Sequence, residues 1–510
     1  MAATTQNLSP QIPPRSTRAK PLLIGNWPDP TVVLHDGHYY MTHSSFESQT
    51  GLLLWRSRDL LNWKPVARAA QSQKGSIWAP DLIKHNGRFY LYYPAAGENW
   101  VVTADSPEGP WSEPVPIGAP MIDPGHVVGD DGKRYIHLSG GHAVEMSDDG
   151  LKATSTPRKV YEGWPIPDDW AIECFCLESP KLLKRNGWFY LTSAEGGTTG
   201  PSTSHLVCSA RSRGPLGPWE NSPHNPIIRT WRRNEAWWSK GHGTILEGPD
   251  GRWYCILHGI MNGYRSLGRC TLIEPIEWTV DGWFRAAEEW PAGWDEPARA
   301  EMELSDDFRA PQLGIQWQIP GRPGTRTFEV GGGQLRLPGH GAHPGVSHPL
   351  CVQPLHRAYE IEVEVEIEPG DTAPDASGSG AGAPISPSAG LMLFASSSTY
   401  LGLSISPDGV LRRVQQGCRD YRWRQDSTLG GRRARLRIVN DKQDIRFYYQ
   451  DDAGAWRVTQ PGMEISAWGA CHAALFACGG GSARFHNFSY RPLETPEELE
   501  RDLRRWDSTD

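Results

Sequence analysis

Asp36-Gly37-His38-Tyr39-Tyr40 joins a turn pair to an aromatic segment, and variants of this phrase recur along the first half of the sequence. An Asp-Gly or Asn-Gly pair between apolar segments is a strong β-hairpin signal, because a type I′ turn needs positive φ at both central residues. The phrase returns at residues 86–90, 131–135, 186–190 and 250–254. The sequence therefore predicts five hairpins of one kind.

The spacing of these phrases indicates how the hairpins are assembled. Their turn glycines are separated by 50, 45, 55 and 64 residues. A period of this length, in sequence punctuated by Gly and Pro, is typical of propeller blades, which are four-stranded sheets around a channel. We predict an all-β chain in which residues 21–298 form a five-bladed β-propeller. Residues 21–30 are expected to enter the first blade, and residues 277–283 to close the last.

Equivalent positions in the repeats carry polar groups. Asp123, Glu178 and His242 each stand nine residues before a turn glycine, as does Trp78, and Asp29 stands eight before the first. If each hairpin joins the two innermost strands of its blade, these side chains converge on one pocket. The alternative is that acidic residues merely decorate blade edges. The shared position favours a common site.

The second half of the sequence predicts a different β-structure. Residues 359–367 alternate apolar and acidic side chains, the pattern of a sheet with one buried face. Similar strands recur to about residue 493, so residues 299–493 are expected to form a β-sandwich. Residues 369–389 are almost wholly Gly, Ala, Ser, Pro and Asp, which predicts a mobile loop. Residues 1–20 predict a disordered lead, and 494–510 a helical tail with a capping box at Thr495 and Glu498.

Composition excludes some partners. The 510 residues carry a net charge of −8 and no basic stripe, so neither nucleic acid nor an anionic membrane surface is an expected partner. No apolar segment reaches the 18 residues that would suggest a membrane span. The 23 Trp residues suit cores and stacking against sugar rings, and most are expected to fill contacts between blades.

The cysteine pattern indicates neither a disulfide framework nor a metal cluster. Nine cysteines are scattered along the chain, and Cys174 and Cys176 are too close for a zinc or redox CxxC motif. Reduced cysteines, and the lack of an apolar leader segment near residue 1, lead us to expect a cytoplasmic protein.

A set of short motifs resembles glycoside hydrolase family 43, whose members are five-bladed propellers that hydrolyse xylose- and arabinose-containing polysaccharides with inversion. The resemblance runs from Asn26 to about Trp294 and, more weakly, through the sandwich. Each motif is weak alone, but their order and spacing are specific. They are Trp27-Pro28-Asp29-Pro30, Ser44-Ser45-Phe46-Glu47, Trp78-Ala79-Pro80-Asp81, Ile122-Asp123-Pro124, Glu178-Ser179-Pro180-Lys181, Ala194-Glu195-Gly196-Gly197, Lys240-Gly241-His242-Gly243 and Leu267-Gly268-Arg269.

The resemblance implies roles for the three carboxyl groups. Asp29 matches the general base, Glu178 the general acid, and Asp123 the third carboxylate, whose negative charge would raise the pKa of the acid and orient it. Hydrolysis with inversion needs a carboxylate and a carboxylic acid about 6.5–9.5 Å apart, with water between the base and the sugar. Blades one and four lie across the axis from each other, which can supply such a gap.

The resemblance also implies binding residues. Phe46 and Trp78 match hydrophobic walls of the subsite for the terminal sugar, and Arg269 would donate to sugar hydroxyls or to a carboxylate. His242 could hold a central calcium ion through water, bond Glu178 or substrate, or be a core histidine. The chemistry is expected to need no cofactor beyond such a structural ion. Asp81 lies three residues past the inner position and is interpreted as structural.

These motifs lead to a functional hypothesis. We expect an inverting exo-glycosidase that releases a terminal pentose from short oligosaccharides, as a β-1,4-xylosidase with α-L-arabinofuranosidase activity. An enzyme whose main activity is that of an arabinofuranosidase is the first alternative. A non-catalytic sugar-binding or protein-interaction propeller is an alternative of another class. Three carboxylates at equivalent positions argue against it, because a binding surface needs no acid–base pair.

Overall fold

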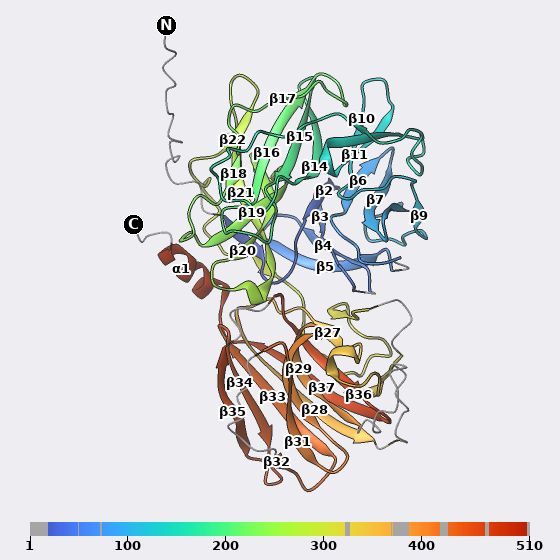
Figure 1. Cartoon of the computed structure of the whole chain (residues 1–510), viewed down its shortest axis with the longest axis vertical. Helices are drawn as coiled ribbons and strands as arrows, with labels where there is room; N and C mark the ends of the chain where they lie inside the picture. The colour runs from blue at the N-terminus through green and yellow to red at the C-terminus, as the bar shows by residue number, and fades with distance from the viewer. Residues whose placement is uncertain are drawn as a thin grey trace.

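The computed structural model describes residues 19–506, apart from 49, 72–73, 322–326, 369, 371–386, 419–426 and 465–468. A propeller lies above a β-sandwich in the view of Figure 1. The expected disordered lead falls on residues 1–18, which lie outside this description. Ala19 is buried and Lys20 begins a strand, so the fold starts slightly earlier than predicted.

Within the described residues, five sheets form the blades of the propeller. The innermost strands contact one another in ring order, from blade one through to blade five and back. Blade one contains β2 (Thr31–His35), β3 (His38–Thr42), β4 (Leu52–Ser57) and β5 (Asn62–Ala69), and blade two contains β6 (Asp81–His85), β7 (Arg88–Ala95), β8 (Glu98–Ala104) and β9 (Val115–Pro116). Blade three contains β10 (Gly125–Val128), β11 (Arg134–Leu138), β12 (His142–Met146) and β13 (Arg158–Lys159), and blade four contains β14 (Leu177–Arg185), β15 (Trp188–Glu195), β16 (Leu206–Ser212), β17 (Glu220–Asn221) and β18 (Ile228–Arg229). Blade five contains β19 (Trp237–Glu247), β20 (Trp253–Met261), β21 (Arg269–Trp278), β22 (Phe284–Ala286) and β1 (Lys20–Leu23).

The repeated phrase forms the turn between the first two strands of every blade. In blades one, two and four both turn residues have positive φ, as at Asp36 (47°) and Gly37 (69°), which confirms the type I′ prediction. The other two hairpins use longer loops instead. In blade three the N–H of Gly129 donates to the carbonyl of Lys133, and in blade five Gly248 donates to Arg252 in the same way.

The prediction for how the ring closes was wrong. Residues 20–23 do not enter the first blade, because β1 pairs antiparallel with β21, placing Lys20 opposite Ile273. β22 pairs with the other end of β21, so the long outer edge of this strand is covered twice. An uncovered edge would present unpaired N–H and C=O groups to other chains. The fifth blade is therefore built from both ends of the propeller sequence.

The propeller also extends past its predicted boundary at residue 298. β23 (Arg299–Ala300) lies parallel to β5, at the outer edge of blade one. From there the chain crosses to the sandwich, and one apolar core spans both parts. Trp27 and Trp55 of the propeller belong to the same buried cluster as Phe308 and Trp317. The two parts therefore share a continuous hydrophobic contact.

The sandwich confirms the prediction for residues 299–493 in its main features. The buried face of β28 (Ala358–Glu368) carries Ile361, Val363 and Val365. Its acidic face pairs with arginines of β33 (Arg433–Asp441), as between Glu362 and Arg437. Its described strands form two seven-stranded sheets, β24-β27-β36-β29-β30-β31-β32 and β25-β26-β37-β28-β33-β34-β35. These strands are β24 (Trp317–Gln318), β25 (Glu329–Gly331), β26 (Gln334–Pro338), β27 (Leu350–Val352), β28 (Ala358–Glu368), β29 (Ser388–Ser396), β30 (Thr399–Ile405), β31 (Val410–Gln416), β32 (Ser427–Thr428), β33 (Arg433–Asp441), β34 (Asp444–Gln450), β35 (Trp456–Glu464), β36 (His472–Cys478) and β37 (Ser482–Pro492).

The tail forms the predicted helix, α1 (Pro496–Trp506). Thr495 Oγ1 accepts the N–H of Glu498 over 3.2 Å, and Glu498 Oε2 accepts the N–H of Thr495 over 2.9 Å, which is a capping box. Most of the predicted loop 369–389 lies outside the described residues, but Ser388 and Ala389 already belong to β29. In the described part of the chain, no helix has the length and apolar character of a membrane span.

Candidate active site

The side chains predicted to converge are brought together where the inner strands begin. Asp29, Asp123 and His242 all have positive φ, of 59°, 58° and 59°, and so does Ser179, beside Glu178, at 51°. This conformation is unfavourable for residues with a Cβ atom and is often found at functional sites. The pairing of β14 with β15 shifts register beside Glu178, and that of β19 with β20 shifts beside His242. Such bulges change the direction in which a side chain points. Local strain and bulges thus shape the site.

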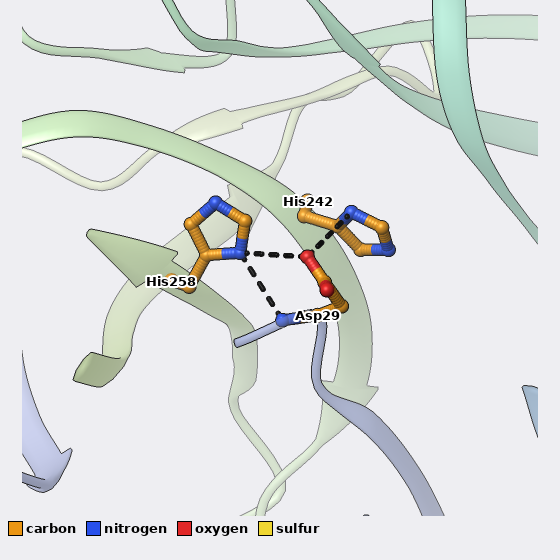
Figure 2. A group of neighbouring side chains, drawn as sticks. All are labelled: Asp29, His242 and His258. Atoms are coloured by element: carbon orange, nitrogen blue, oxygen red, sulfur yellow. Dashed lines mark hydrogen bonds and ion pairs between the residues drawn. The ribbon is translucent and has the colours of Figure 1, made fainter. Parts of the chain in front are cut away.

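Asp29 is buried among cationic and imidazole groups. Arg269 Nη1 donates to Oδ1 over 3.0 Å, and Nδ1 of His242 lies 3.3 Å from the same oxygen (Figure 2). The hydroxyl of Ser44 donates to Oδ2. Burial alone would favour the neutral acid, but the charge of Arg269, with His242 and His258, holds the pKa of Asp29 well below its usual value. Asp29 is therefore a carboxylate at neutral pH.

His258 is fixed by three contacts. Its Nδ1 lies 3.1 Å from the backbone nitrogen of Asp29 and 3.2 Å from Oδ1 of the same residue (Figure 2), and Thr198 Oγ1 lies 2.9 Å from its Nε2. Burial lowers the pKa of His258, which agrees with a neutral ring. His258 thus links the base in blade one to a loop of blade four.

Asp123 and Glu178 are a coupled pair of carboxyl groups. Burial, together with the charges of Glu178 and Asp29, raises the pKa of Asp123 to about 8, although its Oδ2 accepts the N–H of Ser179 over 2.9 Å. Burial and the charge of Asp29 also raise the pKa of Glu178. Two such neighbours cannot both ionise cheaply, so at neutral pH the pair retains a proton.

This arrangement changes the predicted cause of the Glu178 pKa shift. We expected the charge of Asp123 to raise it, but Asp123 is itself largely neutral near pH 7 because its own pKa is about 8. Burial and the negative charge of Asp29 are the main causes, and Glu173 contributes further. Among the described residues, no hydrogen bond engages the carboxyl group of Glu178, which leaves it open to a ligand.

Phe46 and Trp78 lie at the edge of this site. Phe46 exchanges two backbone hydrogen bonds with Ile77, of 2.9 and 3.0 Å, so the first-blade loop is tied to the residue before Trp78. Trp78 is 45% exposed, and the guanidinium of Arg269 lies 5.6 Å from the centre of the Phe46 ring. Their role as sugar-binding walls stays a prediction.

Comparison with known proteins identifies the family. The profile of glycosyl hydrolases family 43 matches residues 18–284, just over half of the chain, and that of the beta xylosidase C-terminal concanavalin A-like domain matches residues 305–491. This chain belongs to glycosyl hydrolase family 43. The resemblance seen in its motifs is thereby confirmed.

Individual relatives have related names. A xylan 1,3-beta-xylosidase of Vibrio sp is 34% identical over 314 residues, which cover 52% of this chain and 57% of that protein. A non-reducing end alpha-L-arabinofuranosidase of Bacteroides ovatus is 30% identical over 361 residues, or 64% of this chain and 65% of the relative. The chain thus spans less than two thirds of the length of these relatives. The crystal structure of a xylan beta-1,4-xylosidase from Bacillus halodurans C-125 is 25% identical, with a TM-score of 0.78 over 93% of this chain and all of that one.

In this family 43 chain, Asp81 holds blades together, as we interpreted from its position. Its Oδ1 lies 2.9 Å from Lys181 Nζ of blade four, and its Oδ2 accepts the backbone N–H of His126, in blade three, over 2.8 Å. Thr31, of blade one, also donates to it over 3.4 Å. Asp81 and Lys181 are both buried, and these contacts connect three other blades to the segment of blade two that carries Asp81.

Sequence reasoning missed three residues that support Asp29. His258 lies in β20, whose positions we did not compare between repeats, and Thr198 lies in a loop with no repeat signal. Ser44 was visible in its motif but received no role. Its hydroxyl also accepts the N–H of Ala79 over 2.7 Å, so it ties the base to the loop that carries Trp78.

The structure shows which carboxyl group His242 contacts. It contacts Asp29 rather than Glu178, and burial lowers its pKa to about 3, so the ring is neutral. Asp29, His242 and His258 offer one oxygen and two nitrogens within 4.8 Å of one another, beside the cation of Arg269. Calcium prefers about 6–8 oxygen ligands, so this group does not fit direct binding. The buried Nε2 of His242 has no partner among the described residues and could bond a water molecule.

The expectation of no disulfide was wrong at one place. Cys174 and Cys176 are joined, with their Cα atoms 5.2 Å apart. Gly196 accepts the N–H of Cys174 and donates to the carbonyl of Cys176, so the backbone between them folds into a tight loop. Six of the other seven cysteines are buried thiols.

Proposed function

We propose that this chain is an inverting exo-glycosidase that releases a terminal pentose from short oligosaccharides. The observation that carries the proposal is that one site holds two carboxyl groups whose pKa values are shifted in opposite directions. The pKa of Asp29 is held low, and that of Glu178 is raised. Glycoside hydrolysis by two carboxyl groups needs such a carboxylate and such an acid.

In the proposed reaction, Asp29 removes a proton from a water molecule that attacks the anomeric carbon. Glu178 protonates the oxygen of the leaving sugar on the opposite face. The two residues start from blades one and four, which are not neighbours in the ring. That separation supports inversion, which needs about 6.5–9.5 Å between the carboxyl groups, over retention, which needs about 5–5.5 Å. Arg269 and Phe46 would hold the terminal sugar against the base.

Xylose is the proposed sugar, with arabinofuranose second. The names of relatives support both, since they include xylosidases and an arabinofuranosidase. The proposed substrates are xylo- or arabinoxylo-oligosaccharides. The first test is release of nitrophenol from aryl β-xyloside and aryl α-L-arabinofuranoside. Turnover of neither, with xylose binding retained, would instead support a sugar-binding propeller.

The stereochemistry of the product tests the mechanism directly. If no covalent glycosyl-enzyme forms, a β-xyloside must give α-xylose as its first product. Proton NMR in the first minutes of a reaction at high enzyme concentration distinguishes the anomers before mutarotation mixes them. β-xylose as the initial product would reject both the inverting mechanism and the role of Asp29 as base.

We propose further that the chemistry needs no metal ion, because the two carboxyl groups supply both proton transfers. A calcium ion would be held through water at His242 and would act on stability alone. Treatment with EDTA should therefore leave kcat unchanged, and re-addition of calcium should affect only the melting temperature. Loss of kcat in EDTA that calcium restores would contradict this.

A further inference from the structure

One aromatic side chain near the acid is not used by the proposed mechanism. Phe175 is 75% exposed, the highest value for any aromatic residue among the exposed large hydrophobic residues of the described chain. Trp78 is the other aromatic residue in that set, and it lies beside the site. An exposed aromatic ring offers a flat apolar face that can stack on the C–H face of a sugar.

Phe175 lies on the acid's own segment. It precedes Glu178 by three residues and stands just before β14. The neighbouring Glu173 shows where this segment lies, because its charge contributes to the raised pKa of Glu178. Glu173 also interacts electrostatically with Arg269, on the other side of the site. Glu173 also bonds to residues 199 and 200, and the adjacent Thr198 contacts His258, which contacts Asp29. Residues 173–178 therefore lie close to both the proposed acid and the proposed base.

This segment is held in place by several bonds. The carboxylate of Glu173 accepts the N–H groups of Thr199 and Gly200 over 2.7 and 2.9 Å, and the hydroxyl of Thr199 donates to it over 2.5 Å. Gly196 bonds to the backbone on both sides of Phe175, and the Cys174–Cys176 disulfide closes the loop. A binding group held in one place loses little conformational entropy when a ligand arrives.

We propose that Phe175 is the platform for the leaving-group sugar, the residue that binds the unit next to the terminal pentose. The argument rests on the proposed function. Glu178 must reach the oxygen between the terminal and the second sugar, so groups on the acid's own segment border the second sugar. Phe46 and Trp78, on blades one and two, border the terminal sugar instead. Phe175 would thus favour oligosaccharides over substrates with a small leaving group.

Binding to an inactive variant tests the platform without depending on turnover. In a Glu178→Gln background, xylobiose and xylose are titrated by calorimetry with and without Phe175→Ala. Loss of one sugar–aromatic stack should weaken xylobiose binding about three- to tenfold. Xylose, which fills only the terminal subsite, should bind unchanged. Phe175→Trp should retain xylobiose binding, and Val280→Ala, which removes an exposed apolar side chain from a distant loop, should change nothing.

Turnover gives a second readout. With Glu178 intact, Phe175→Ala should lower kcat/KM on xylobiose about three- to tenfold. It should leave β-xylosyl fluoride unaffected, since fluoride has no ring to stack. Equal loss on both substrates, or no loss on xylobiose, would overturn the platform. If the wild-type chain releases xylose from neither xylobiose nor β-xylosyl fluoride, the proposed function is rejected. The binding experiment would still decide the role of Phe175.

Discussion

Arg269 Nη1 donates to Asp29 Oδ1 over 3.0 Å, while its guanidinium also lies 5.6 Å from the centre of the Phe46 ring. One side chain therefore sets the charge of the proposed base and borders the proposed sugar subsite. Burial alone would push Asp29 toward the neutral acid, and Arg269 is the strongest of the groups that oppose this. The ion pair keeps the base ready at neutral pH.

Arg269→Gln should move the acidic limb of the pH profile of kcat/KM to higher pH. This limb reports protonation of the base in the free enzyme. Loss of an adjacent positive charge raises the pKa of a carboxyl group by about one unit or more, so Asp29 would be protonated earlier as pH falls. Arg285→Gln, which removes an exposed arginine from a surface ion pair, serves as the control. An unmoved acidic limb would show that Arg269 does not set the charge of Asp29.

Glu178→Ala should have an effect that depends on the leaving group. Natural disaccharides need protonation of the departing oxygen, which contributes about 10²–10⁴-fold to the rate. Aryl glycosides with good leaving groups need little, so they should lose far less activity. Asp29→Ala should reduce both substrates together, because water must be activated in either case. Equal losses on both substrates in Glu178→Ala would remove Glu178 from the role of acid.

Asp123→Asn should shift the alkaline limb to lower pH. In the wild type, burial and the charges of Glu178 and Asp29 raise the pKa of Asp123 to about 8, and the pair with Glu178 retains a proton up to that range. With a neutral amide in place of Asp123, Glu178 no longer shares its proton with a second carboxyl group and ionises at lower pH. The measurement is kcat/KM between pH 5 and 9. A limb that stays in place with full activity would make Asp123 a residue of the blade edge alone.

The same variant should also change stability in a defined direction. A carboxyl group whose folded pKa is raised destabilises the fold as pH rises from its unfolded value toward about 8, because the folded state holds the proton longer. Asp123→Asn removes this penalty. The melting temperature of the variant minus that of the wild type should therefore rise between pH 4 and pH 8. No pH dependence of that difference would contradict the raised pKa of Asp123.

Lys181→Met should be strongly destabilising. It leaves Asp81 buried without its cation, and removing one partner of a buried pair costs about 3–5 kcal/mol. The double variant Asp81→Asn/Lys181→Met should recover part of that loss. Lys133→Met breaks the exposed pair with Glu145 and should change stability little, because solvent screens such pairs. Denaturant unfolding compares the three variants, and equal costs for Lys181→Met and Lys133→Met would show that Asp81 does not hold blades together.

Local pattern was enough to predict most of the fold. Each hairpin is specified by a turn pair and flanking strands within about 15 residues, and the alternation in β28 specifies its buried face through Ile361 and Val363. Five equivalent hairpins then imply a ring, which in turn places Asp29, Asp123 and Glu178 together. The convergence of the site thus follows from a repeat that can be read in the sequence.

What the sequence did not reveal depends on contacts between distant or irregular segments. Lys20 and Pro21 are typical of an edge strand, but they do not specify which sheet β1 joins, so nothing in its sequence indicates that it pairs with β21. His258 acts only through its place beside Asp29, which no spacing indicates. The Cys174–Cys176 bond closes a loop that is held by backbone hydrogen bonds to Gly196. Gly196 follows the end of β15, so this contact joins segments about 20 residues apart.

The pairing of Lys20 with Ile273 has a consequence for how the chain matures on the ribosome. About 250 residues must be synthesised between the two partners, which takes about 10–50 s at about 5–20 residues per second. Blades two to four have all their strands before then, and blade one lacks only β23, whereas β1 must wait as an unpaired apolar segment. The nascent ring stays open until β21 emerges, so the interval before closure is when this chain most needs protection from aggregation.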